Sequence, residues 1–212
     1  MDNYIITVAR GFGSGGKLIA SQLANDLGIQ CYESRILTLA SEFSGYDEKR
    51  FLEADEKIPG GYLANKLRSF PHSHIPIPMM KKFDSDDRIF EYQAEVIRNL
   101  AKTESCVIVG KCADHVLRDF DNVISVYIEA PRAFCVKQVM EKMHVSESEA
   151  HNIITATDKY RADYYKYYTG GNYWTNPVNY DMTLNSEKVG LDHCVSVIKN
   201  YLNIKFNVNI ER

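Results

Sequence analysis

The chain of 212 residues is 45% hydrophobic and 25% charged, and its formal net charge is −3. This composition is ordinary for a soluble globular protein and supplies enough apolar residues for a core. The slightly negative charge provides no chain-wide basic surface for nucleic acid. Because no apolar run approaches the roughly 18 residues of a membrane span, we expect neither a nucleic-acid nor a membrane partner.

Cysteine usage indicates a reducing compartment. The five cysteines are odd in number and form no C-x-x-C pair, which favours buried thiols and a cytoplasmic location. Met1 leads directly into an apolar run at 4–8, so we expect no signal peptide. A length of 212 residues fits one domain with an inserted subdomain, or two small domains at most. We expect a single domain over residues 1–212 without internal repeats, as a monomer or a homo-oligomer.

The first elements alternate between strand and helix patterns. Residues 4–8 are a short β-branched run that predicts a buried strand, and residues 10–16 are rich in glycine. Apolar residues then recur at helical spacing from Lys17 to Leu27, where Gly28 is suited to end a helix. The next expected elements are a strand at 29–32 and a helix at 36–43.

Residues 44–85 differ in character from the rest of the chain. Four prolines and three glycines interrupt this stretch, which predicts an irregular insertion with helices near 47–57 and 61–69. His72 and His74 have no third ligand at a suitable spacing. We therefore predict no metal site there.

The second half of the chain continues the alternation. Residues 106–110 and 123–128 predict buried strands, and Ser146 with Glu149 has the form of a capping box that begins a long helix. The tail at 204–210 alternates like a further strand. Other expected elements are helices at 86–102, 112–118, 131–143, 146–168 and 189–202 and a strand at 180–184. The pattern predicts an α/β fold whose mostly parallel sheet has helices on both faces and a ligand site at the carboxyl ends of its strands.

The glycine-rich stretch after the first strand is the strongest chemical signal. It reads Gly11-Phe-Gly13-Ser14-Gly15-Gly16-Lys17 and fits G-x-x-x-x-G-K between a strand and a helix. Glycines let the backbone curl so that its N–H groups face a bound polyphosphate, and the helix adds its positive N-terminal end. We expect Lys17 to contact the β- and γ-phosphates.

One position departs from this motif. Leu18 stands where Ser or Thr ordinarily supplies a hydroxyl group for Mg²⁺. A shift of one residue aligns Gly13-Ser14-Gly15 with the G-S-G of many kinases, and Lys17 then takes the hydroxyl position. The sequence leaves both registers open, so residue 11 and residues 13–18 are all expected to bind the nucleotide.

Four segments resemble one family of P-loop nucleoside-monophosphate kinases, the cytidylate-kinase-like family. They follow in the correct order from about residue 4 to 198 and are Ile6–Arg10 with Phe12–Gly16, Glu95–Arg98 with Cys106–Asp114, Asp158–Gly170, and Asn179–Asn185. The resemblance implies a three-layer P-loop kinase fold with a helical acceptor-binding insertion at 44–85 and a lid region at 155–178. It also implies ATP and Mg²⁺ as co-substrates and CMP or dCMP as the phosphate acceptor.

Phosphoryl transfer depends on positioning and charge neutralisation, so cationic side chains should converge on the phosphates. In the lid, Arg161 and Lys166 join Lys17 as catalytic candidates, and Lys159 is a substrate-binding candidate. On a helix, Lys159 and Lys166 share one face and Arg161 lies roughly opposite. Either the lysines or Arg161 are therefore expected to face the phosphates.

The resemblance also implies residues on the acceptor side. Lys111 stands where the family has an arginine that contacts the acceptor nucleotide, and Asp114 and Arg98 are further candidates. No carboxylate ends the strand at 106–110. The Mg²⁺ ligands therefore stay unassigned, with Asp55 or Glu56 as alternatives.

Two other functions remain open. Leu18, Lys111 and the lysine-rich lid also fit a nucleotide-binding regulator that has lost catalysis. The proline- and histidine-containing insertion also fits a kinase for another small acceptor.

Overall fold

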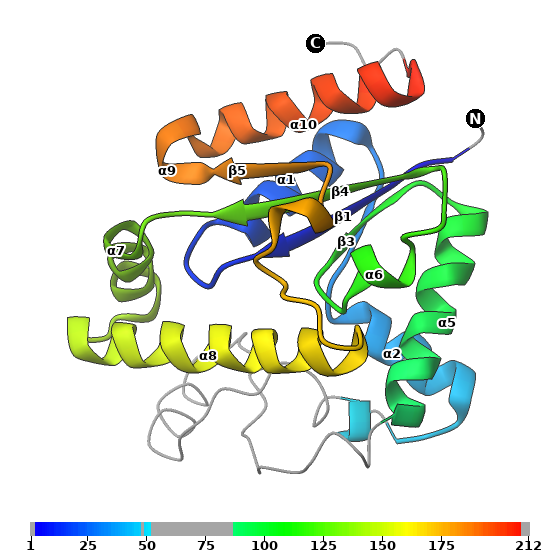
Figure 1. Cartoon of the computed structure of the whole chain (residues 1–212), viewed down its shortest axis with the longest axis horizontal. Helices are drawn as coiled ribbons and strands as arrows, with labels where there is room; N and C mark the ends of the chain where they lie inside the picture. The colour runs from blue at the N-terminus through cyan, green and yellow to red at the C-terminus, as the bar shows by residue number, and fades with distance from the viewer. Residues whose placement is uncertain (1–2, 48, 52–86, 209–212) are drawn as a thin grey trace.

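A computed structural model of the chain describes residues 3–47, 49–51 and 87–208 (Figure 1). Its strands are β1 (Ile5–Arg10), β2 (Gln30–Tyr32), β3 (Cys106–Val109), β4 (Val123–Glu129) and β5 (Met182–Asn185). Its longer helices are α1 (Gly16–Leu27), α2 (Arg35–Ser44), α5 (Asp87–Thr103), α7 (Arg132–Met143), α8 (Glu147–Tyr168) and α10 (Leu191–Phe206). The short helices are α6 (Ala113–Val116), the 3₁₀ turn η2 (Pro177–Asn179) and α9 (Ser186–Val189).

The strands form one parallel sheet in the order β2-β3-β1-β4-β5. β1 lies at its centre, where Ile5 pairs with Cys106 of β3 and with Val123 of β4. Because all five strands run in the same direction, the loops that follow them gather at one edge of the sheet. Ligands of open α/β sheets bind at this edge.

Alternation along the strands divides the core into two layers. Ile6 and Val8 pack with α1 and α10, whereas Ile5 and Ile108 pack with α2, α5 and α6. Figure 1 shows α10 and α8 on opposite sides of the sheet. The chain therefore has the expected three-layer α/β fold with helices on both faces.

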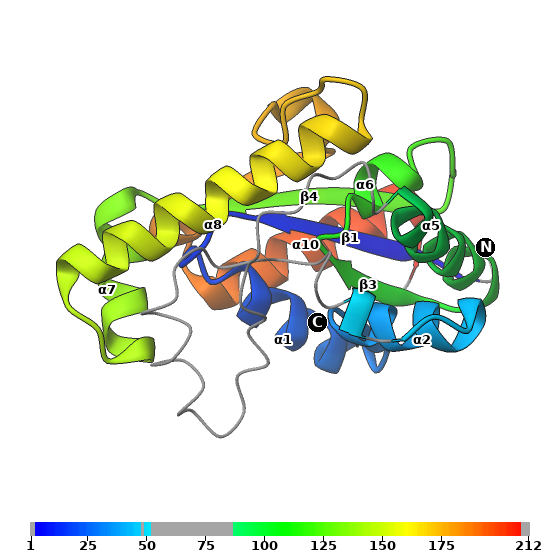
Figure 2. The same ribbon diagram turned by 90° about the horizontal axis from the view of Figure 1, so that it is seen from below.

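Helix α8 crosses the sheet obliquely (Figure 2) and begins with the predicted capping box. Glu149 accepts a hydrogen bond from the Ser146 amide at 2.9 Å, and Ser146 accepts one from the Glu149 amide at 3.3 Å. Near the other end of α8, the Tyr168 ring stacks on Phe90 of α5 with ring centres 3.9 Å apart. Both ends of the helix are thus stabilised, and its middle lies near the carboxyl edge of the sheet.

The strand predicted at 204–210 is wrong for the residues that the structure describes there. Helix α10 continues to Phe206, and Asn207 ends it with a φ of 52°. Val195, Ile198 and Leu202 form a buried stripe at helical spacing, and the Phe206 ring stacks on Tyr4. This packing outweighs the alternation of the tail.

The predicted insertion at 44–85 lies largely outside the described residues, which include only 44–47 and 49–51 of it. The helices predicted near 47–57 and 61–69, the His72/His74 pair, and Asp55 and Glu56 belong to this part. Among the described helices, none is long and apolar enough to cross a membrane.

Candidate active site

Two glycines bend the loop between β1 and α1. Gly13 and Gly15 have φ angles of 84° and 81°, in the left-handed region that other residues rarely adopt. A Cβ atom at Gly13 would lie 2.8 Å from the carbonyl oxygen of Cys135 on α7. A side chain there would meet both backbone strain and main-chain atoms, so this turn requires glycine.

Side chains from three parts of the chain brace this loop. Ser14 is fully buried and donates its hydroxyl hydrogen bond to the Gly11 carbonyl at 2.8 Å. Ser186 of α9 donates to the Ser14 carbonyl, and Asp158 of α8 accepts from the Phe12 N–H at 2.9 Å. Two loop carbonyl oxygens are thereby paired within the protein.

Four amides of the loop and of the first helical turn have no acceptor in the part of the chain that the structure describes. In residues 3–47, 49–51 and 87–208, no acceptor group forms a hydrogen bond with the N–H groups of Gly13, Gly15, Lys17 and Leu18. These groups lie at the start of α1, a helix of 12 residues. Unpaired amides at such a helix start attract an anion. The loop is therefore suited to hold a phosphate group.

Glu33 joins two cations beside this loop. It follows β2, and its carboxylate lies 3.6 Å from the Arg10 guanidinium and in contact with the Lys17 ammonium group. The Lys17 side chain is 62% exposed, and ion pairs that open to solvent contribute roughly 1 kcal/mol or less. Breaking the contact between Lys17 and Glu33 therefore costs little free energy, and Lys17 can bind a phosphate group instead.

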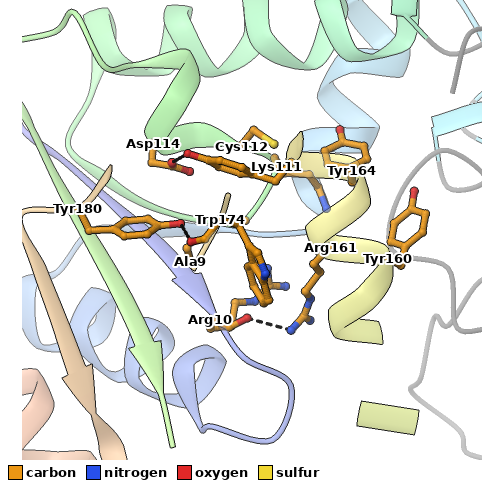
Figure 3. A pocket seen from close by; sticks show the side chains of 12 residues that line it. Ala9, Arg10, Lys111, Cys112, Asp114, Tyr160, Arg161, Tyr164, Trp174 and Tyr180 are labelled. Carbon is orange, nitrogen blue, oxygen red and sulfur yellow. Dashed lines mark hydrogen bonds between the residues drawn. The ribbon is translucent and has the colours of Figure 1, made fainter. Parts of the chain in front are cut away.

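A cavity of about 50 Å³ lies beside the loop (Figure 3). It brings together three residues that the sequence singled out, namely Lys111, Asp114 and Arg161. Arg10 adds a further cation. The aromatic side chains that line it are Tyr160, Tyr164, Tyr165, Trp174 and Tyr180. The cavity thus combines cations with flat apolar rings.

The turn after β3 carries Lys111 into this cavity. Gly110, Lys111 and Cys112 have successive φ angles of 72°, 60° and 52°. Left-handed backbone at two non-glycine residues costs free energy and is concentrated at functional sites. The turn leaves the Lys111 side chain buried and leads directly into α6.

Asp114 on α6 is buried against α8. Its carboxylate accepts a hydrogen bond of 2.7 Å from the Tyr165 hydroxyl group. Burial raises the pKa of Asp114 to about 6, while the bonds from Tyr165 and from the Asp114 and His115 amides act in the lowering direction. Asp114 therefore fixes the turn after β3 relative to α8. Its carboxylate already accepts several hydrogen bonds from the protein.

We predict that Tyr165→Phe lowers the free energy of unfolding by about 1–3 kcal/mol at pH 7.5. Without the hydroxyl donor the pKa of Asp114 should rise further above 6, because the substitution destabilises the folded protein when Asp114 is ionised. Below pH 6 Asp114 is protonated, and the loss should shrink. Urea denaturation at pH 7.5 and pH 5 measures both values. The exposed Tyr173→Phe serves as control, and an equal loss at the two pH values would contradict this account.

Arg161 faces the glycine loop. Its side chain is 9% exposed and donates a hydrogen bond of 3.0 Å to the Arg10 carbonyl. The guanidinium lies 5.5 Å from the centre of the Phe12 ring and 3.5 Å from Asp158. Of the two arrangements that the sequence left open for the lid helix, the structure places Arg161 toward the loop.

The other predicted cations lie outside the cavity. Lys159 is exposed and paired with Asp163 at 2.8 Å. Lys166 is also exposed, and its ammonium group lies over the Tyr173 ring. Arg98 on α5 lies 3.7 Å from Glu95. The structure therefore does not bring these three side chains to the residues that line the cavity.

The described residues offer little to a metal ion on its own. Leu18 is exposed and supplies no oxygen ligand, and no group of three or more His, Cys, Asp or Glu side chains in the described ranges could hold a metal. Mg²⁺ commonly takes one or two carboxylates and otherwise phosphate and water oxygens. These residues fit a Mg²⁺ ion that arrives with the nucleotide.

Sequence reasoning missed four residues of this site. Glu33 directly follows the strand predicted at 29–32. This position predicts that Glu33 lies at the carboxyl edge of the sheet, where the ligand site is expected. Asp158 belongs to the segment that resembles the family lid, but its partner Phe12 is 146 residues away in the chain. Tyr180 belongs to the segment at 179–185 that resembles the family, and Trp174 has no local signal in the sequence.

Comparisons with known proteins show the family and the fold of the chain. Residues 5–188 match a family model described as the Cytidylate kinase-like family. No curated protein matches the chain. A similar solved structure is that of an uncharacterized protein from Eubacterium ventriosum ATCC 27560, with 28% identity and a TM-score of 0.68 over 95% of this chain and 99% of that one.

Two structures of named kinases show the same fold at lower identity. A sugar kinase from Janibacter sp. HTCC2649 has 14% identity and a TM-score of 0.52, with 95% of each chain covered. Shikimate kinase from Bacteroides thetaiotaomicron has 11% identity and a TM-score of 0.51, over 94% of this chain and 98% of that one. The fold is that of P-loop kinases, and with the family match it supports nucleotide-dependent phosphoryl transfer. The chain belongs to the cytidylate kinase-like family.

Proposed function

We propose that this protein transfers the γ-phosphoryl group of ATP to a nucleoside monophosphate, with CMP or dCMP as the acceptor. One observation carries the proposal. The amides of Gly13, Gly15, Lys17 and Leu18 have no acceptor among the described residues and lie together at the start of α1, where they can donate to the oxygens of a polyphosphate. The start of the helix at Gly16 favours the register in which Gly16-Lys17 ends the motif.

Cations near the loop would neutralise the charge of the transferred group. Lys17 would leave Glu33 and contact the β- and γ-phosphates. Arg161, held at the loop by the Arg10 carbonyl, would stabilise charge on the equatorial oxygens. Mg²⁺ bound with ATP would supply positive charge that neutralises part of the charge on the phosphates.

The cavity beside the loop would receive part of the acceptor. Lys111 and Arg10 offer positive charge to its phosphate group, and the aromatic rings offer stacking surfaces to its base. On α5, the buried amide oxygen of Gln93 has no hydrogen-bond partner within the described part of the chain. A buried acceptor left unpaired is costly, so a bound water or acceptor is expected to donate to it. The resemblance to the family implies that the insertion at 44–85 supplies further contacts to the acceptor.

Turnover assays test this proposal directly. The purified protein is incubated with ATP, Mg²⁺ and CMP, dCMP, UMP or AMP, and the nucleotides are separated by chromatography. We expect a diphosphate with CMP or dCMP at a higher rate than with UMP or AMP. If none of the four nucleoside monophosphates is converted to its own diphosphate, the proposed activity is refuted.

A catalytically weak nucleotide-binding regulator is the second candidate. It is favoured by Leu18, which offers no hydroxyl group, and by Glu33, which engages both Arg10 and Lys17. Calorimetry separates the two functions, because a regulator binds ATP without transfer to any acceptor. Transfer only to acceptors other than nucleotides would instead indicate a kinase for another small molecule.

A further inference from the structure

Among the described residues, two hydrogen bonds connect α8 to the residues that begin the glycine loop. The Asp158 carboxylate accepts the Phe12 N–H at 2.9 Å. One turn further along the helix, Arg161 donates to the Arg10 carbonyl at 3.0 Å. Asp158 and Arg161 lie 3.5 Å apart as an i,i+3 ion pair. One carboxylate therefore touches both the loop backbone and the cation that covers the loop.

We propose that Asp158 is a positioning residue for phosphoryl transfer, because its carboxylate holds the Phe12 amide and the Arg161 guanidinium in one fixed arrangement. The proposal rests on the function proposed above. Asp158 itself need not touch either substrate. It acts through the loop, whose amides hold the phosphates, and through Arg161, whose charge stabilises the transferred group.

The charge of Asp158 matters because its two contacts are charge-assisted. A carboxylate accepts an N–H hydrogen bond more strongly than a neutral carboxamide does, and only the ionised group attracts Arg161. An error of about 1 Å in the position of a catalytic group can cost about 100-fold in rate. Loss of this one charge is therefore expected to slow transfer while leaving the nucleotide site formed.

Ionisation of Asp158 should be visible in the neutral to acidic range. Burial raises the pKa of Asp158 to about 6, although Arg161 and the Phe12 amide favour the ionised form. The charged and titratable groups that face it are Arg161 on α8, Glu129 and Tyr127 on β4, and Arg132 and Cys135 on α7. As the pH falls through about 6, Asp158 takes up a proton and both contacts weaken.

Asp158→Asn and Asp158→Ala separate the two contacts. Asparagine keeps an acceptor oxygen for Phe12 but loses the charge, so we expect kcat to fall about 10- to 100-fold with little change in the KM for ATP. Alanine removes the acceptor as well and should also raise the KM for ATP. The control is Asp119→Asn, because Asp119 is 84% exposed and pairs only with Arg118 among the ion pairs of the described residues. Turnover of Asp158→Asn equal to that of this control would overturn the proposal.

The amide signal of Phe12 provides a readout that does not depend on turnover. In ¹H–¹⁵N spectra of the wild-type protein we expect this signal to titrate with a midpoint near 6, and to be independent of pH between 5 and 7 in Asp158→Asn. Asp114 also has a pKa of about 6, but its titration is retained in that variant. The same midpoint for the Phe12 amide in both proteins would overturn the proposal. A wild-type protein without turnover would refute the proposed function, and the Phe12 titration would then still test whether Asp158 holds the loop.

Discussion

Replacing Lys17 with methionine should lower kcat/KM for ATP by about 10²- to 10³-fold, the usual cost of one preorganised charge-stabilising group. Methionine keeps the length and apolar character of the side chain but removes the ammonium group that would meet the phosphates. The Lys17 side chain is largely exposed and contacts Glu33. Its removal should therefore change the free energy of unfolding by about 1 kcal/mol or less.

The measurement is steady-state turnover with varied ATP, accompanied by thermal denaturation. Lys142→Met is the matched control, since Lys142 is exposed in the last turn of α7. A Lys17→Met variant that unfolds like the wild type and retains turnover within a few-fold of it would show that Lys17 does not contact the phosphates. The phosphate site would then need a different cation.

Replacing Arg161 with alanine should lower kcat by about 10³-fold, as expected for an arginine that stabilises the charge of a transferred phosphoryl group. Arg161 is buried at the loop, where it contacts the Arg10 carbonyl and the Phe12 ring. Arg161→Lys should recover only part of the rate, because an ammonium group cannot reproduce the planar fork of a guanidinium.

Lys159→Ala and Lys166→Ala provide the comparison within the same helix. Their side chains are engaged by Asp163 and the Tyr173 ring, so we expect less than about a tenfold loss of kcat, as for removal of a screened surface charge. Single-turnover assays and circular dichroism distinguish slow transfer from misfolding. A larger loss for either lysine variant than for Arg161→Ala would mean that the lid cations take the opposite arrangement in the reacting complex.

The sequence predicted the elements whose signals are local. The glycine at 28 takes the left-handed conformation expected at the end of α1, and the capping box at Ser146 begins α8. The alternation of buried strands and amphipathic helices predicted the parallel three-layer fold. These features were predictable because each depends on residues a few positions apart.

Other features depend on contacts between distant segments. The orientation of α8 decides that Arg161 rather than Lys159 faces the loop, and helical spacing alone cannot give the rotation of a helix about its axis. The contact of Glu33 with Lys17 depends on the position of β2 relative to the loop. The strand predicted at 204–210 is wrong where the structure describes it, because the short alternation of the tail is weaker than the buried stripe of α10. Tertiary packing decides such cases.

The phosphate-holding role of the loop is tested most directly by ¹H–¹⁵N spectra recorded during addition of a non-hydrolysable ATP analogue with Mg²⁺. We expect the largest shifts at the amides of Gly13, Gly15, Lys17 and Leu18, which lack acceptors among the described residues, because new hydrogen bonds to phosphate oxygens deshield amide protons. Saturable binding that leaves these four signals unchanged would contradict the account.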